Sequence, residues 1–161
     1  MQWYAPCENN GFLWHHVRNL LWSYEHFLAK PLFDTQGCEE EAIARQLFHA
    51  PFAIVSHGTE SDPIFNYANQ TALTLFAMDW QAFTSMPSRF SAEPVSREER
   101  ARLLERVTRD NYIDDYQGVR IAKNGTRFLI KQAIVWNVVD EKTQTKLGQA
   151  AAFSQWEALD Q

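Results

Sequence analysis

The sequence predicts an α+β domain in which helices pack on one face of an antiparallel sheet. Residues 50–78 read as two short strands followed by a helix, residues 116–139 read as a β-hairpin, and helical periodicity dominates the regions before and between them. With 161 residues, 45% of them apolar and 14% aromatic, the chain can bury a core without metal or disulfide support. We expect a helical extension over residues 1–49 that packs on a core domain over residues 50–161, giving one globular unit.

Two helices are expected at the N-terminus. Over residues 12–32 the apolar positions 13, 17, 20, 21, 24 and 28 fall on one stripe at helical spacing, and Pro31 closes the run. Trp14 and Trp22 lie off this stripe, so the helix carries apolar surface on a second side. We expect a packing contact there, with a dimer interface as the alternative. Residues 39–49 predict a second helix, whose acidic start suits the positive end of the helix dipole.

The central segment predicts the beginning of the sheet. Short apolar runs over residues 52–56 and 64–67 predict two strands, with a turn that begins at His57-Gly58. Asn69 stands where the pattern changes to apolar residues at 73, 76 and 77. We therefore expect Asn69 to cap a helix by accepting a hydrogen bond from an amide of its first turn.

A Pro- and Ser-rich connection over residues 85–94 leads to a further helix over residues 97–110. Ser96 and Glu99 have the spacing of a capping box, and Leu103, Leu104 and Val107 follow at helical spacing. The charged segments REER and RLLER, within residues 97–106, are interpreted as a solvated face supported by i,i+4 ion pairs.

Three strands are expected in the last third of the chain. The β-rich runs over residues 116–122 and 126–139 flank Asn124-Gly125, a dipeptide that favours a two-residue type I′ turn, and residues 149–156 predict the fifth strand. Strict alternation in the longer run would place one set of side chains on a common face toward the helices: Phe128, Ile130, Gln132, Ile134, Trp136 and Val138. The opposite face is also partly apolar, and we expect the N-terminal helix to cover it.

Composition argues against several classes of protein. The formal charge is -5, from 15 Lys plus Arg and 20 Asp plus Glu, and no basic cluster offsets it, so nucleic acid is not an expected partner. The sequence shows no signal-peptide pattern and no uncharged run long enough to span a bilayer, which predicts a soluble, cytoplasmic protein without membrane association. Cys7, Cys38 and the histidines lack metal-ligand spacing, so no disulfide framework or metal site is expected.

Four stretches carry a resemblance to a known family: SHGTESDPIFNYAN (56–69), MPSRFSAEP (86–94), YQGVRIAKNGTRF (116–128) and residues 132–156. They resemble the MEKHLA domain family, which is PAS-like and occurs both as small stand-alone proteins and at the C-terminus of plant homeodomain-leucine zipper regulators. The resemblance covers nearly the whole chain. It implies a five-stranded antiparallel sheet of order 2-1-5-4-3 whose helices enclose a small cavity. PAS domains sense small molecules, light or redox state, or mediate dimerisation.

The cofactors of PAS sensors can be compared with these residues. Flavin-binding light sensors place a reactive cysteine on the helix after the central one, but Cys7 and Cys38 both precede the core domain. Haem-binding PAS sensors use a histidine on the helix predicted here over residues 97–110, which contains none. A covalent flavin-thiol adduct and a His-ligated haem are therefore not expected, whereas a non-covalent flavin or a small organic ligand stays open.

Six residues are candidates for binding a ligand: His57, Tyr67, Asn69, Arg120, Gln132 and Trp136. Each has a structural alternative. His57 can close its turn by bonding a backbone group or Asp62, Asn69 can act only as a helix cap, and Tyr67 can simply fill the core.

Arg120 lies in an otherwise apolar strand, where its charge needs either an anionic ligand or a carboxylate partner, with Glu60, Asp62 and Glu93 as the candidates. Exposure on a sheet edge would also explain it. Gln132 and Trp136 could meet a ligand together, or Gln132 could bond the backbone while Trp136 packs in the core.

Three functions follow from these observations. The first is a PAS-like sensory or ligand-binding module that signals through helix packing or the state of a homodimer. The second is a structural dimerisation module with a filled core and no ligand. The third is a small α+β enzyme in which His57 acts as a general base with Glu60 or Asp62. The enzyme ranks last, because no nucleophile, base and orienting group stand together at a recognisable spacing.

Overall fold

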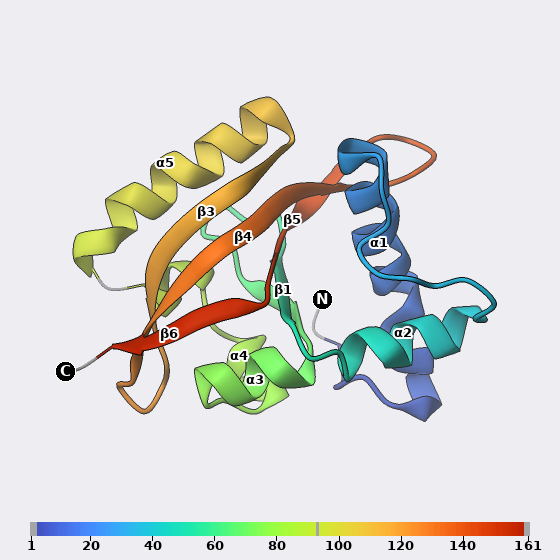
Figure 1. The fold of residues 1–161 in the computed structure, drawn as a ribbon, viewed down its shortest axis with the longest axis horizontal. Coiled ribbons are helices and arrows are strands. Elements are labelled where there is room, and N and C mark those ends of the chain that lie inside the picture. Colours follow the sequence, from blue (N-terminus) through green and yellow to red (C-terminus); the bar gives the residue numbers. More distant parts are fainter. Residues whose placement is uncertain (1–2, 93, 160–161) are drawn as a thin grey trace.

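The computed structural model describes residues 3–92 and 94–159. Its centre is an antiparallel sheet of order β2-β1-β5-β4-β3, to which a short sixth strand adds beside β4. Figure 1 shows this sheet with α5 along one side and with α1 and α2 grouped at the other end of the molecule. The predicted fold class and strand order are thus confirmed.

The N-terminal helices are shorter than predicted. A 3-10 segment, η1 (Glu8–Leu13), precedes α1 (Trp14–Leu28), and α2 spans Glu40–Phe48. The predicted helix over residues 12–32 ends early because Ala29 adopts a left-handed conformation with a φ of 62°, and its N–H closes the last turn on the carbonyl of Glu25.

The central segment follows the prediction closely. β1 (Ala53–His57) and β2 (Phe65–Ala68) pair antiparallel, and α3 (Gln70–Phe76) follows directly. The side chain of Asn69 accepts a hydrogen bond from the amide of Ala72, which confirms its role as the helix cap.

The connection that follows contains more regular structure than its composition indicated. α4 (Trp80–Phe83) and a 3-10 turn, η2 (Ser88–Ser91), precede α5 (Pro94–Asp110). The start predicted for α5 was wrong. The helix begins at Pro94, whose fixed φ suits a first helical position, so Ser96 lies inside the first turn and not at its cap.

The C-terminal hairpin is confirmed, with a different turn. β3 (Tyr112–Ile121) and β4 (Arg127–Val139) pair antiparallel. Gly125 has a φ of 88°, whereas neither Lys123 nor Asn124 has a positive φ, so the loop is a type I turn followed by a left-handed glycine and not a type I′ turn.

The predicted fifth strand is two strands. β5 (Lys146–Phe153) pairs with both β1 and β4, and β6 (Gln155–Leu159) pairs with the beginning of β4. The register passes from Ile134 opposite Ala152 to Lys131 opposite Gln155, and between these pairs Gln132 has a φ of 49°. β4 therefore bends at Gln132.

This bend reverses the predicted face assignment in the second half of β4. Ile130, Ala133 and Val135 line one cavity on the face toward α5, whereas the Trp136 indole donates a hydrogen bond of 3.1 Å to the carbonyl of Leu20 in α1. Between the pairs Gly118–Ile130 and Tyr116–Ala133, β4 has one residue more than β3, and this extra residue moves every following side chain of β4 to the other face. The prediction that Gln132 and Trp136 share the face of Phe128 and Ile130 was wrong for this reason.

Helices thus cover both faces of the sheet. α5 packs its Leu103 and Val107 against Ile113 and Val135, forming a small apolar cluster. On the opposite face α1 is attached through Ser23, whose hydroxyl accepts from the amide of Val139 at 2.8 Å and donates to the carbonyl of the same residue at 3.2 Å.

Candidate functional site

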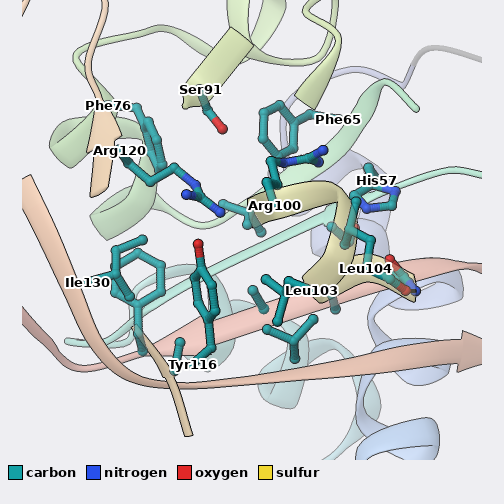
Figure 2. A pocket seen from close by; sticks show the side chains of 18 residues that line it. His57, Phe65, Phe76, Ser91, Arg100, Leu103, Leu104, Tyr116, Arg120 and Ile130 are labelled. Carbon is teal, nitrogen blue, oxygen red and sulfur yellow. Dashed lines mark hydrogen bonds between the residues drawn. The ribbon is translucent and has the colours of Figure 1, made fainter. Parts of the chain in front are cut away.

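The candidate site is a cavity of about 60 Å³ between the sheet and the middle of α5. Figure 2 shows its wall, with the side chains of α5 on one side and those of β3 and β4 on the other. The apolar lining consists mainly of Phe65, Phe76, Leu103, Ile130, Val135 and Phe153. The polar lining consists of Ser56, His57, Ser91, Arg100, Tyr116, Arg120 and Gln149.

Arg100 brings a buried positive charge into the cavity from α5. Arg100 is only 9% exposed, and its guanidinium donates a hydrogen bond to the hydroxyl of Ser88. Burial and the nearby charge of Arg120 lower the pKa of Arg100 to about 10, which still leaves the guanidinium charged at neutral pH.

Arg120 brings a second buried charge from β3. It is 8% exposed, donates a 3.0 Å hydrogen bond to the carbonyl of Val119, and lies 5.3 Å from the centroid of the Tyr116 ring. Figure 2 shows the Tyr116 hydroxyl pointing toward Arg120 inside the cavity. Tyr116 can lie there because Gly118 has no side chain: a Cβ at Gly118 would stand 2.1 Å from the hydroxyl.

His57 lines one end of the cavity as a neutral ring. Its Nδ1 donates to the carbonyl of Gly58 at 2.9 Å, and its Nε2 is buried without a hydrogen-bond partner. Burial lowers the pKa of His57 to about 4. The predicted turn-closing bond to the backbone is confirmed.

The carboxylates considered for a catalytic pair with His57 are engaged elsewhere. Asp62 pairs with Arg89 at 3.0 Å, and Glu60 accepts a hydrogen bond of 3.1 Å from the amide of Ile64. Glu60 lies near His57, but neither carboxylate forms a hydrogen bond with the ring, as the proposed pair of a histidine general base and its carboxylate would require.

A polar network fixes the C-terminal half of α5 beside the cavity. The Gln149 amide donates to the carbonyl of Leu104 at 3.3 Å and to the side-chain oxygen of Asn137 at 3.1 Å. Asn137 in turn donates to the carbonyl of Val107 at 3.0 Å. These buried amides attach the C-terminal half of α5 to β4 and β5.

Four of the sequence-predicted residues lie outside the cavity. The side chain of Asn69 forms hydrogen bonds with the backbone of Ile54 and Leu47. Trp136 packs under α1, and Gln132 is exposed at the bend of β4. Tyr67 lies against the rings of His16 and Trp80. Burial raises the pKa of Tyr67, and its hydroxyl has no hydrogen-bond partner.

The structure brings together His57 and Arg120 among the predicted residues, and it adds Arg100 and Tyr116, which the sequence analysis missed. Arg100 was interpreted as part of a solvated face. That interpretation holds for Arg102, which pairs with Glu98 at 3.5 Å, but it was wrong for Arg100. The sequence did contain a signal for the burial of Arg100. Arg100 precedes Leu103 and Val107 at helical spacing and so falls on the apolar stripe of the helix.

The structure also tests two of the three carboxylates predicted as partners of Arg120. Glu60 and Asp62 do not pair with it, because both are engaged as described above, and Glu93 lies outside the described residues. The burial of Arg120 also rules out the predicted alternative that this residue is exposed on a sheet edge.

Other features of the described chain bear on cofactors. Cys7 is exposed and Cys38 is half-buried, and neither lines the cavity. Within residues 3–92 and 94–159, no three side chains of His, Cys, Asp or Glu are grouped so that they could hold a metal ion. No helix in these ranges has both the length and the apolar character needed to cross a membrane.

Comparison with solved structures finds PAS folds. A PAS domain from Colwellia psychrerythraea matches with a TM-score of 0.58 at 15% identity, over 68% of this chain and 91% of that one. A light-oxygen-voltage domain studied with a flavin analogue matches at 0.54 and 18% identity, over 74% and 85%. A PAS domain from a two-component sensor histidine kinase matches at 0.54 and 14% identity, over 71% and 91%.

Comparison of sequences identifies the family. Homeobox-leucine zipper protein ATHB-9 of Arabidopsis thaliana is 26% identical over 129 residues, which is 78% of this chain. The matched region is only 15% of that protein, so this chain corresponds to a small part of its relative. The family model of the MEKHLA domain matches residues 14–158. The chain therefore belongs to the MEKHLA domain family, on a PAS fold.

Proposed function

We propose that this chain is a cytoplasmic PAS-like sensory module that binds a small molecule in the cavity beneath α5 and signals by changing helix packing or dimer state. The observation that carries the proposal is the cavity itself, where buried polar groups from three separate elements meet inside apolar walls: His57 from β1, Arg100 from α5 and Arg120 from β3. Enclosed apolar pockets with a few convergent polar groups are the usual form of small-molecule sites.

The position of Arg100 supports a route from ligand to helix. From Leu104 onward α5 is attached to the sheet through Gln149 and Asn137, whereas Arg100 lines the cavity one turn earlier in the helix. A ligand bound to Arg100 would therefore act on α5 just before the part of the helix that is attached to the sheet. Rearrangement of one helix against a packed sheet is a common form of switching in proteins.

The cavity volume supports a ligand smaller than a flavin. Sites for drug-sized ligands and cofactors enclose about 300–1,000 Å³, whereas this cavity measures about 60 Å³. A flavin ring would require Arg100, Tyr116 and Arg120 to leave the cavity. The residues present therefore do not fit a flavin, and we propose a compact organic ligand in its place.

A native mass spectrum of the full chain, recorded after gentle desalting, tests the proposal. The expected result is a second peak series displaced by the mass of one small molecule, which collapses to the bare protein after denaturation. A Leu103→Trp variant, designed to fill the cavity, should lose that series while keeping the fold by circular dichroism. Bare protein in both samples, together with no binding from a metabolite extract, would exclude the sensory proposal.

A structural dimerisation module is the second candidate, and the half-buried aromatic residues of α1 favour it. Trp14 and Trp22 line a groove beside Leu32 and Phe33. If α1 forms a homodimer interface, replacing Trp14 and Trp22 by Gln should halve the mass measured by sedimentation. A monomeric parent protein, or an unchanged mass in the variant, would exclude this interface.

A further inference from the structure

Two guanidinium groups share the cavity, and within residues 3–92 and 94–159 no carboxylate forms an ion pair with either of them. Arg100 and Arg120 are 9% and 8% exposed, and both line the same space. Their mutual repulsion contributes to the lowered pKa of Arg100. Among the described residues, neither makes an ion pair with a carboxylate, and their hydrogen bonds go to the Ser88 hydroxyl and the Val119 carbonyl.

Two buried like charges without a counterion destabilise the folded state. A buried charge is normally paired, and removing two like charges from water without a counterion raises the free energy of the folded state. The described carboxylates of this region offset it only in part: Asp62 acts favourably on Arg100 but is itself paired with Arg89, and Glu60 accepts from a backbone amide. The lining of the cavity is therefore electropositive.

We propose that the ligand of this cavity is a small organic carboxylate, held by the guanidinium groups of Arg100 and Arg120. This inference rests on the proposed function and names the chemical class of the ligand. Guanidinium groups match carboxylates in charge and in planar geometry, and they can donate two parallel hydrogen bonds. Tyr116 offers a further hydroxyl donor directed toward Arg120 (Figure 2).

The rest of the lining restricts the ligand further. Phe65, Phe76, Leu103 and Ile130 form apolar walls, so the ligand carries an apolar body, which an inorganic anion lacks. A volume of about 60 Å³ admits on the order of four to six non-hydrogen atoms, at roughly 10–15 Å³ for each water-sized group. Short monocarboxylates such as propionate and butyrate have this size and form.

The test compares short carboxylates with neutral molecules of the same shape. The melting temperature of the full chain is measured with acetate, propionate, butyrate and valerate, with the matching primary amides, and with inorganic phosphate. We expect a rise in melting temperature that grows with carboxylate concentration and is largest for one chain length, because a ligand that binds only the folded state stabilises it. The amides and phosphate should give no rise.

Variants of the two arginines assign the effect to the cavity. Arg100→Met and Arg120→Met should each weaken carboxylate binding about 10- to 100-fold, as expected for the loss of a charged hydrogen-bond partner. Arg102→Met, an exposed arginine on the same helix, is the matched control and should bind as the parent does. Without carboxylate, Arg100→Met should melt at the same or a higher temperature than the parent, because it removes an unpaired buried charge.

The outcomes separate this inference from the proposed function. Equal stabilisation by amides and carboxylates, or carboxylate binding that survives both arginine substitutions, would overturn the carboxylate assignment while leaving a ligand site in the cavity. A lower melting temperature for Arg100→Met in carboxylate-free buffer would overturn it as well, because it would assign Arg100 a structural role. If no carboxylate or amide binds and the native mass spectrum shows bare protein, both proposals fail.

Discussion

Replacing Asn69 by Ala should destabilise this protein far more than the loss of a helix cap. The side-chain oxygen of Asn69 accepts hydrogen bonds from the backbone amides of Ala72 at 3.1 Å and Ile54 at 3.2 Å. Its amide group donates to the carbonyls of Leu47 at 3.1 Å and Phe52 at 2.8 Å. The side chain is fully buried, so one residue joins α2, β1 and α3 in the interior.

The magnitude follows from these four bonds. Loss of a helix cap costs about 1 kcal/mol, and each buried backbone group left unpaired costs roughly 1–3 kcal/mol. With three such groups beyond the cap, and some relaxation around them, we expect the free energy of unfolding to fall by about 3–5 kcal/mol. That is a large share of the stability of an ordinary domain.

Urea unfolding followed by circular dichroism measures this loss, with Asp79→Ala as the matched control. Asp79 caps α4 by accepting from the amide of Ala82 at 2.8 Å, and it is exposed, so its replacement should cost only about 1 kcal/mol. If Asn69→Ala proved no more destabilising than Asp79→Ala at equal m-values, the role of Asn69 as a buried hub would be refuted.

Three further predictions concern the interior. Burial lowers the pKa of His16 to about 3 and that of His57 to about 4, so between pH 6.5 and 4 the unfolded state binds more protons than the folded state. The free energy of unfolding should therefore fall by about 2 kcal/mol per histidine from pH 7 to 5. In urea titrations, His16→Gln should reduce this pH dependence. Gly148→Ala would place a Cβ 1.9 Å from the His57 carbonyl oxygen, so it should lower the melting temperature sharply. Trp136→Phe removes the indole that donates to the Leu20 carbonyl and leaves a gap under α1, so it should cost about 2 kcal/mol in urea, whereas an unchanged midpoint would show that α1 is attached elsewhere.

Much of the fold could be predicted because its signals are local. The Asn69 cap, the Asn124-Gly125 turn and the apolar runs each depend on residues close in sequence, and together they predict the elements in their order along the chain. The order of the strands within the sheet came from the family resemblance. The bend at Gln132 has no such signal. The positive φ of Gln132 coincides with the extra residue of β4 in its pairing with β3, and strand pairing is a long-range property.

The site was predicted less completely for a related reason. His57 and Arg120 were identified because a polar residue in an apolar strand is unusual. Arg100 lies among charged neighbours, which concealed its place on the apolar stripe of α5. Trp136 was assigned to the wrong face because alternation was counted through Gln132.

The central claim is that a ligand occupies the cavity beneath α5, and methyl NMR of the full chain tests it most directly. Spectra are compared for protein as purified, for protein unfolded, desalted and refolded, and for refolded protein given back the released small molecules. The account predicts reversible shifts of the Leu103, Ile130 and Val135 methyl groups, which lie around the cavity, and unchanged signals from Val17 and Leu20 under α1. Three identical spectra, or shifts confined to the α1 face, would contradict it.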